Sequence, residues 1–249
     1  MKPKPVRQRL DLLLVERGLA DSPEKAGALI LAGEVEVDGK RVDKAGTPFP
    51  SNAKIKIISR HRKYVSRAGI KLEGALKDFA IRPAGRVCLD VGCSHGGFTD
   101  CLLQRGAAHV YAVDVNVEQL DWKLRQDGRV TPVRRNAREL AVDDLPQLAD
   151  LVTIDVSFIS VLQVLSPAAQ LAKPGAIFVI LIKPQFELPR GKVGPGGIVK
   201  SKKLRDRAVL SVLKNLKPLG LKSLQVRPSR LPGAEGNQEY FLHARKIPG

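Results

Sequence analysis

Aromatic residues and cysteine are both scarce in this chain of 249 residues. Phe, Trp and Tyr together make up 4%, and there are three cysteines, Cys88, Cys93 and Cys101. Three cysteines cannot all pair within one chain, and their spacing fits no common zinc pattern. We therefore expect reduced thiols, no bound metal and a cytoplasmic location.

The chain also lacks a long apolar run. The longest stretch without a formal charge, residues 156–172, contains Ser, Gln and Pro. It is shorter than the roughly 20 apolar residues that a membrane-spanning helix needs. The basic N-terminus has no apolar core of the kind found in secretory signals, so we expect no membrane partner.

Acidic residues are few compared with basic ones. There are 25 Asp and Glu against 42 Lys and Arg, which gives a formal net charge of +17. Such an excess says nothing about the fold, but it favours a polyanionic partner. The alternative is a generically basic protein without one. Hydrophobic residues make up 43%, which is enough for a packed core.

The first 60 residues are typical of a small α+β unit. Leucines at helical spacing predict a helix over residues 7–18, and a second helix follows over residues 22–33. Valines around the Asp-Gly pair at 38–39 predict a hairpin, and alternation over residues 54–58 predicts one more strand.

After residue 66 the pattern changes to alternating strands and helices. Apolar runs predict strands at residues 86–91, 109–115, 130–133, 151–156 and 176–182, with 221–226 and 239–244 at the far edge of the sheet. This alternation predicts a doubly wound α/β domain with a mostly parallel sheet. We expect domains at residues 1–59 and 66–249, joined by a basic linker at 60–65.

Residues 92–98 follow the predicted strand at 86–91 and are rich in small side chains. Glycine in such a turn lets the backbone approach a ligand, although helix–sheet packing would also explain it. The spacing is not that of a dinucleotide site, and an acid at the end of the strand suits a cationic amino group. A second acid, 24 residues later, stands where carboxylates bind ribose hydroxyls. We therefore expect S-adenosylmethionine to bind at Asp90, Gly92, Ser94, Gly96, Gly97, Phe98 and Asp114.

Two further charged residues stand at the ends of neighbouring predicted strands. Asp155 follows residues 151–154, and Lys183 follows six apolar residues. Ligands of open α/β sheets bind beyond the carboxyl ends of the strands, so we expect both side chains in that crevice. A lone lysine at a strand end is usually just solvated, but an aspartate beside it favours a functional pair.

Six segments of the chain strongly resemble the TlyA (hemolysin A) family: YVSRAGIKL at 64–72, DVGCSHGGFTD at 90–100, TIDVSFIS at 153–160, IKPQFE at 182–187, GKVG at 191–194 and GNQEYF at 236–241. That family comprises ribose 2′-O-methyltransferases of ribosomal RNA, related to the FtsJ type. The resemblance covers nearly the whole chain. It implies a Rossmann-like methyltransferase domain and a cytidine in ribosomal RNA, or in a ribosomal subunit, as substrate.

The resemblance also implies a catalytic tetrad of Lys71, Asp155, Lys183 and Glu239. In it Lys183 would be the general base, and the other three would orient the hydroxyl and the lysines. A ribose hydroxyl is a weak nucleophile, so in-line positioning contributes much of the rate. The chain departs from the family's pattern at His95, where relatives usually have a small hydroxyl residue, and more mildly at Cys93.

The N-terminal unit is similar to the alpha-L RNA-binding module. Its second helix departs from that pattern, because Pro23 and Glu24 replace a basic pair that often binds phosphate. A second basic stretch, residues 190–207, begins in a Gly/Pro-rich segment next to the expected crevice, and we expect it to order over RNA near the target nucleotide. We expect RNA contacts from Arg7, Arg9, Lys25, Lys40, Arg41, Arg62, Lys63, Arg67, Arg190 and Lys192, although each one alone is more often simply solvated.

Three alternatives stay open at this point. The chain could be a non-catalytic RNA-binding or ribosome assembly protein that retains the fold. It could be a membrane-active hemolysin, as the family's second name suggests, or a methyltransferase for a protein or small molecule. The tetrad residues argue against the first, the missing amphipathic or spanning element against the second, and the attached RNA-binding module against the third.

Overall fold

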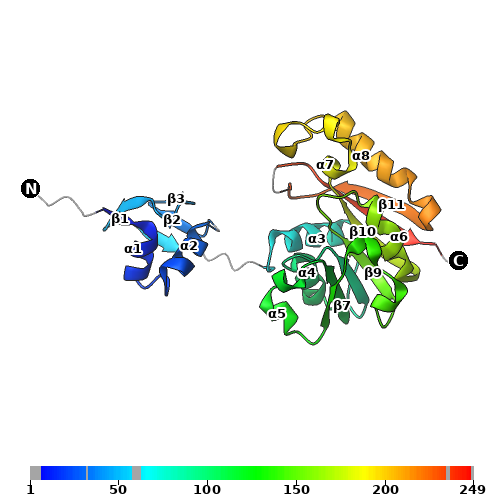
Figure 1. The fold of residues 1–249 in the computed structure, drawn as a ribbon, viewed down its shortest axis with the longest axis horizontal. Coiled ribbons are helices and arrows are strands. Elements are labelled where there is room, and N and C mark those ends of the chain that lie inside the picture. The colour runs from blue at the N-terminus through cyan, green and yellow to red at the C-terminus, as the bar shows by residue number, and fades with distance from the viewer. Residues whose placement is uncertain (1–6, 32, 58–62, 234–235, 248–249) are drawn as a thin grey trace, which may run out of the picture. The chain divides into compact units, whose positions relative to one another are not determined.

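The computed structural model describes residues 7–31, 33–57, 63–233 and 236–247 and divides the chain into two units, residues 1–62 and 63–249 (Figure 1). A linker is expected at residues 60–65. The structure describes residues 63–65 of it, and these contact the second unit. Tyr64 is buried there, and the Val65 amide donates to the carboxylate of Asp100 at 2.8 Å. The second unit therefore includes residues 63–65.

Within its described residues, the first unit contains two helices and five short strands: β1 (Arg7–Arg9), α1 (Leu10–Glu16), α2 (Pro23–Leu31), β2 (Val35–Val37), β3 (Lys40–Arg41), β4 (Pro48–Pro50) and β5 (Ile55–Ile57). The helices pack on the sheet β3-β2-β5 through a core that includes Leu10, Leu14 and Ile30. The expected hairpin is present as β2 and β3. Its two turn residues, Asp38 and Gly39, both have positive φ, as a tight hairpin turn requires.

One strand pair of this unit differs from the sequence-based prediction. The predicted first helix begins at residue 7, but α1 begins only at Leu10, and Arg7–Arg9 pairs antiparallel with β4. Both ends of β4 are proline, which has no amide hydrogen and is confined to sheet edges. A strand bounded by prolines gives no periodic signal, so the sequence pattern does not reveal this ribbon.

The second unit contains one seven-stranded sheet and six helices in the part of the chain that the structure describes: α3 (Arg67–Asp78), β6 (Val87–Val91), α4 (Gly97–Gln104), β7 (His109–Asp114), α5 (Trp122–Arg125), β8 (Val130–Arg134), β9 (Ala149–Ile154), α6 (Leu162–Gln170), β10 (Ala172–Ile182), α7 (Pro184–Glu187), α8 (Lys202–Lys214), β11 (Leu221–Pro228) and β12 (Tyr240–Lys246). The strand order is β11-β12-β10-β9-β6-β7-β8. All neighbours pair in parallel except β12, which runs antiparallel between β10 and β11. The predicted doubly wound α/β domain is confirmed.

Both faces of this sheet are buried under helices. Along β10, Phe178 and Ile180 point into a core shared with α6 and α8, and Val179 and Leu181 point into a core shared with α3 and α4. A strand that is covered on both sides reads as a continuous apolar run, which explains the uninterrupted hydrophobic pattern of β10.

The chain reverses its direction across the sheet between β6 and β9. From β6 it proceeds to β7 and β8 on one side, and it then returns to β9 and β10 on the other. The carboxyl ends of β6 and β9 therefore border a crevice, and ligands of doubly wound sheets bind at such a switch point.

All three cysteines are free and buried. Burial raises the pKa of the Cys101 thiol to about 11 and also raises those of Cys88 and Cys93. They therefore remain protonated and act as small apolar side chains. Among the residues that the structure describes, no helix has the length and apolar character to cross a membrane.

Candidate active site

The turn between β6 and α4 has a backbone that requires glycine. Gly92 has a φ of +85°, and a Cβ atom there would lie 2.4 Å from the carbonyl oxygen of Asp155. No side chain fits in that space, so the turn lies directly against the end of β9. Gly96 and Gly97 pack behind it, against α5 and the start of α3.

This turn forms one wall of a cavity of about 170 Å³. Its other lining residues include Phe98, Asp155, Ser157 and Lys183. Residues predicted to bind the cofactor thus face the same space as two residues predicted to act in catalysis.

Asp90 is placed differently from the sequence-based expectation. Its side chain is fully buried beneath the turn, and its two oxygens accept hydrogen bonds from Thr153 Oγ1 at 2.9 Å and Thr99 Oγ1 at 2.7 Å. Burial raises its pKa to about 7, even though both hydroxyls favour the charged form. Asp90 therefore ties β6 to α4 and β9 from inside and does not line the cavity.

Asp114 stands at the end of β7 and holds the turn from its other side. Its carboxylate accepts hydrogen bonds from the backbone amides of Ser94 at 3.0 Å and Asn116 at 3.1 Å. Each carboxylate oxygen can accept a further hydrogen bond. A ribose hydroxyl is a suitable donor.

Lys183 and Asp155 form an ion pair at the carboxyl ends of β10 and β9. Lys183 Nζ lies 2.6 Å from Asp155 Oδ1 and donates a hydrogen bond to Ser157 Oγ at 2.7 Å. The side chains are 11% and 17% exposed. Asp155 Oδ1 is buried. Lys183 Nζ lies within ion-pair distance of it, but no described residue donates a hydrogen bond of normal geometry to this oxygen. It keeps acceptor capacity for a donor that enters the cavity.

Lys71 and Glu239 form a second, more buried ion pair. Lys71 comes from α3, and its Nζ lies 2.6 Å from Glu239 Oε2. Glu239 directly precedes β12. A Cβ atom on Gly233 would lie 2.6 Å from Glu239 Oε1, so the backbone before β12 passes directly over this carboxylate.

Strand register brings the two ion pairs to one edge of the sheet. Ile182 pairs with Tyr240 in the antiparallel ladder of β10 and β12, so Lys183 and Glu239 lie at the same end of adjacent strands. Asp155 stands at that end of β9, the other neighbour of β10. Of the four predicted catalytic residues, Asp155 and Lys183 line the cavity.

Sequence reasoning assigned no role to two polar residues at this edge. One is Ser157, the hydrogen-bond partner of Lys183. The other is the buried Asn237, whose Nδ2 donates to the Gly197 carbonyl and whose Oδ1 accepts from the Val199 amide, both at 2.8 Å. Both residues lie inside the family-like segments, but a single polar side chain in a sequence carries no sign of its partner.

Phe158 is a third residue without an assigned role. Its ring is 89% exposed, its backbone has a φ of +68°, and its centroid lies 5.5 Å from that of Phe186. A non-glycine residue at positive φ is strained, and such strain is concentrated at functional sites. Phe158 is close in the chain to Asp155 and Ser157, which line the cavity.

Comparison with known proteins identifies the family. Residues 64–246 match the FtsJ-like methyltransferase family, and residues 8–55 match the S4 domain. A protein of Mycobacterium tuberculosis named 16S/23S rRNA (cytidine-2'-O)-methyltransferase TlyA is 48% identical, over 96% of this chain and 90% of its own length. The chain belongs to the TlyA family of FtsJ-like methyltransferases.

Other TlyA-family relatives carry two kinds of name. Hemolysin A of Brachyspira hyodysenteriae is 39% identical over 94% of this chain and 98% of its own length. The 23S rRNA (cytidine-2'-O)-methyltransferase TlyA of Campylobacter jejuni is 34% identical over 72% of this chain and 70% of its own.

Solved structures agree with this assignment. One from Streptococcus thermophilus, described as a hemolysin candidate, has a TM-score of 0.75 and 37% identity and covers 98% of this chain and 90% of its own. An S-adenosylmethionine-dependent methyltransferase from Mesorhizobium loti has a TM-score of 0.54 and covers 70% of this chain and 97% of its own. At 18% identity that second likeness shows the fold alone.

Most of the basic residues predicted to bind RNA in the S4 unit of this TlyA-family chain have internal partners. Arg9 pairs with Asp11 at 2.7 Å, and Lys25 pairs with Asp21 at 2.6 Å. Arg7 donates to the carbonyl of a proline in β4. Lys40 and Arg41 are exposed on β3.

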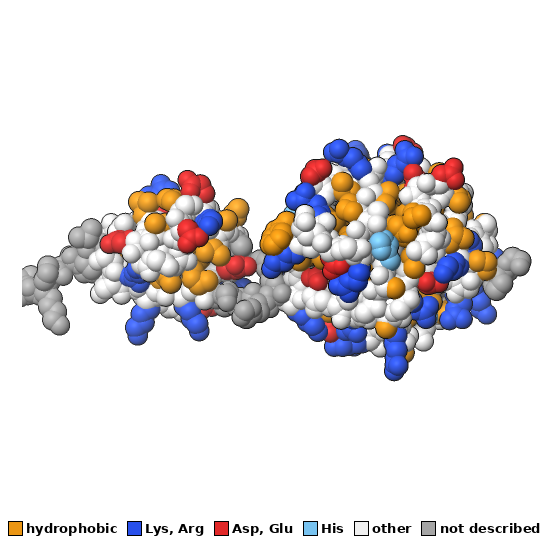
Figure 2. All heavy atoms as spheres, turned by 90° about the horizontal axis from the view of Figure 1, so that it is seen from below, with side chains coloured by type: hydrophobic (Ala, Val, Ile, Leu, Met, Phe, Trp, Pro, Cys, Tyr) orange, Lys and Arg blue, Asp and Glu red, His pale blue; other side chains and the backbone are white. Residues whose placement is uncertain are grey.

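The other predicted RNA contacts belong to the second unit or lie outside the described residues, as Arg62 does. Lys63 pairs with Glu73 at 2.7 Å, and Arg67, Arg190 and Lys192 are exposed. On the face drawn in Figure 2, Lys and Arg side chains are spread over both units. RNA contact by all ten stays a prediction.

Asp90→Asn tests the buried carboxyl. Because folding raises its pKa from 3.8 to about 7, its contribution to stability is full below about pH 4 and is lost as pH rises through 7. The asparagine side chain does not ionise, so the variant does not lose this stability as pH rises. Between pH 4 and pH 8 we expect the variant to lose less stability than the wild type, by up to about 4 kcal/mol.

Denaturant unfolding at several pH values measures this difference. Asp127→Asn is a suitable control, because an Arg129 hydrogen bond lowers the pKa of that surface carboxyl. Parallel pH profiles for the wild type and Asp90→Asn would contradict the burial of a charged group.

Asn237→Ala tests the two hydrogen bonds that join the backbone next to Glu239 to Gly197 and Val199, in the segment before α8. The change removes two hydrogen bonds, each of which contributes about 1 kcal/mol to holding that segment. We expect trypsin to cleave after Arg190 and Lys192 roughly tenfold faster under native conditions. Asn215→Ala, at the exposed end of α8, should leave the rate unchanged. Equal cleavage of Asn237→Ala and the wild type would remove Asn237 from this role.

Proposed function

We propose that this chain transfers a methyl group from S-adenosylmethionine to the 2′-hydroxyl of a ribose, that of a cytidine in ribosomal RNA. The observation that carries the proposal is the cavity in which a glycine turn faces the Lys183–Asp155 pair. The printed activity of the Mycobacterium tuberculosis relative supports the same reaction and substrate. Such a substrate favours a cytoplasmic location.

The residues around the cavity fit the cofactor. The carboxylate of Asp155, whose Oδ1 is buried and which lines the cavity beside the turn, suits a ligand with a cationic amino group. Gly92, Ser94 and Phe98 would contact its methionine part, and Asp114 its ribose. Asp90, Gly96 and Gly97 would act indirectly, by holding the turn. When bound, S-adenosylmethionine supplies a methyl group on a positively charged sulfur, a good electrophile.

His95 is the residue in which this site differs most from the family's pattern. Its ring lines the cavity, and its Nδ1 lies 3.1 Å from Ser94 Oγ. The larger side chain of His95 therefore borders the proposed cofactor site.

Lys183 would take the proton that the 2′-hydroxyl loses, as the free amine. The ammonium seen in the ion pair must first release its own proton to solvent. Asp155 and Ser157, each within 2.7 Å of Nζ, hold the amine at the cavity wall. Lys71 and Glu239 stand at the same sheet edge and would orient the ribose and the Lys183 side chain. Positioned proton transfer of this kind contributes roughly 10²- to 10⁴-fold to a rate.

Several features favour RNA as the substrate. Only RNA carries a 2′-hydroxyl, an S4 domain precedes the catalytic unit, and the net charge is +17. The exposed Phe158, next in the chain to the cavity residue Ser157, offers a surface on which a base can stack. With aromatic residues at only 4%, most of the affinity must come from phosphate contacts and RNA shape.

A non-catalytic role in RNA binding is the main alternative, and loss of one amine separates the two. Lys183→Ala should reduce methyl transfer to ribosomal RNA at least about 100-fold, because the hydroxyl loses its proton acceptor. Binding of S-adenosylmethionine, measured by calorimetry, should change by no more than a few-fold.

Lys173→Ala is a matched control for that variant. Lys173 also pairs with an aspartate, Asp150 at 2.7 Å, but at the opposite end of the same strand. The Lys173→Ala variant should retain full methyl-transfer activity. Turnover of Lys183→Ala equal to that of Lys173→Ala would exclude Lys183 as the base.

The position of the modified ribose identifies the substrate. We expect ribosomal RNA from cells that lack this protein to lose 2′-O-methylation at one or more cytidines in 16S or 23S RNA, and a plasmid copy should restore it. A plasmid copy with Lys183→Ala should not. Unchanged ribose methylation in the deletion strain would contradict the proposed substrate.

A further inference from the structure

The positive charge of the chain is concentrated in one segment of the catalytic unit. Residues 188–234 contain twelve Lys and Arg and a single acid, Asp206, a formal charge of +11 out of the chain's +17. Helix α8 lies in the middle of this segment. Three of its cations, Lys203, Arg207 and Lys214, were given no role by the family resemblance.

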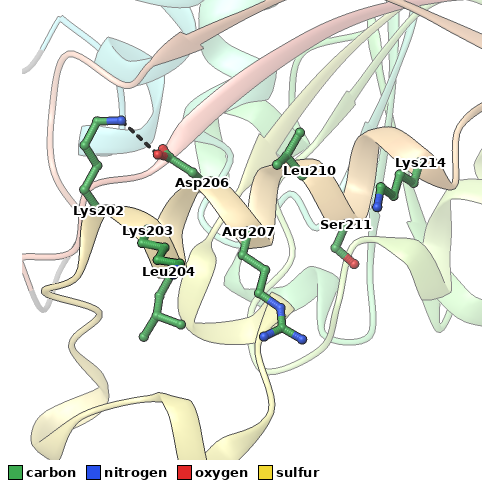
Figure 3. Close-up of a pocket in the computed structure, with 8 residues that line it drawn as sticks. All are labelled: Lys202, Lys203, Leu204, Asp206, Arg207, Leu210, Ser211 and Lys214. Atoms are coloured by element: carbon green, nitrogen blue, oxygen red, sulfur yellow. Dashed lines mark hydrogen bonds and ion pairs between the residues drawn. The ribbon is translucent and has the colours of Figure 1, made fainter.

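These three cations share one face of α8. Their spacing of four and seven residues places them on one side of an α-helix, together with Leu210 and Ser211. Lys203, Arg207, Leu210 and Lys214 are exposed, and Figure 3 shows their side chains along the helix. The opposite side of α8 is buried in the core through Ala208, Val209 and Val212. We name the row of Lys203, Arg207 and Lys214 the α8 basic face.

The cations of the α8 basic face are available for an external anion. The one acid of the segment, Asp206, is neutralised by Lys202 at 2.8 Å (Figure 3). Lys203, Arg207 and Lys214 have no acidic partner among the residues that the structure describes. Eleven residues of helix separate the first from the last, which corresponds to about 16 Å.

The helix is held firmly at its N-terminal end. Ser201 caps it by accepting the Leu204 amide, and Arg205 donates to the carbonyls of Val199 and Lys200. The row of cations therefore has a defined spacing, which lowers the entropy lost when it binds a rigid anionic lattice.

The α8 basic face lies close to the proposed site. Helix α8 packs against α7, and α7 begins at Pro184, directly after Lys183. The proposal below requires the backbone of a nucleic acid with one ribose at Lys183 to extend past α7, the helix that packs against α8.

We propose that the α8 basic face binds the phosphodiester backbone of the substrate RNA outside the target nucleotide. This proposal rests on the proposed function. Arg207, in the middle of the row, can form two parallel hydrogen bonds to one phosphate, and the lysines on either side supply point charges. An acidic protein surface fits less well, because protein interfaces have an apolar core and Leu210 is the one exposed apolar side chain within this row.

A charge-removal variant tests the surface. In Lys203→Gln/Arg207→Gln/Lys214→Gln, three phosphate contacts are lost. We expect affinity for deproteinised bacterial 16S and 23S RNA at 0.15 M salt to fall at least about tenfold. The slope of log K against log salt should become shallower by roughly 2 to 3. Calorimetry should show unchanged binding of S-adenosylmethionine, and thermal unfolding should show an intact fold.

The matched control is Arg82→Gln/Arg86→Gln/Lys222→Gln. It removes the same charge near the amino-terminal ends of β6 and β11, the sheet edge opposite the site. Its affinity and salt slope should stay close to those of the wild type. Equal affinity and slope for the two variants would overturn the proposal.

Two further outcomes separate this proposal from others. If the α8 variant loses affinity for whole ribosomal subunits but not for deproteinised RNA, the partner is an acidic protein and the proposal fails. If the wild type binds RNA but does not methylate it, the proposed function fails, while the comparison of the two variants still decides whether α8 binds RNA.

Discussion

The site depends on the contact between Gly92 and the carbonyl oxygen of Asp155. The turn after β6 reaches the end of β9 because residue 92 has no side chain. This contact brings the glycine turn close to the Lys183–Asp155 pair, and both line one cavity. The switch point of the sheet determines where these two strand ends meet, and the glycine determines how closely they meet.

Buried polar groups then hold each wall of the cavity. Asp90 fixes the turn from below, through hydroxyls of α4 and β9, and Asp114 fixes it from the side, through the Ser94 amide. Asn237 holds the segment before α8 to the backbone next to Glu239. Unpaired polar atoms in such positions would be costly, and the fully bonded ones define one arrangement.

Much of this arrangement follows from the sequence, and the rest depends on pairing. Strands of the doubly wound domain and the crevice position of Asp155 and Lys183 follow from apolar runs and the rule for parallel sheets. The sequence does not predict the pairing of β1 with β4 or the inward orientation of Asp90. The spacing of hydrophobic residues identifies a helix or strand, but it does not identify what that element packs against. Lys71 and Glu239, 168 residues apart, meet only through the register of β12.

The two ends of β10 show why a charged pair alone does not identify a site. Lys173 and Asp150 pair at 2.7 Å at one end, and Lys183 and Asp155 pair at 2.6 Å at the other. The first pair is 44% and 27% exposed, so water screens it, and its aspartate also accepts the Val87 amide. The second is largely buried and leaves one carboxylate oxygen without a hydrogen bond from the described residues. Asp155 and Lys183 also line the cavity, whereas Asp150 and Lys173 do not, so burial beside a cavity, and not the charged pair itself, distinguishes the candidate site.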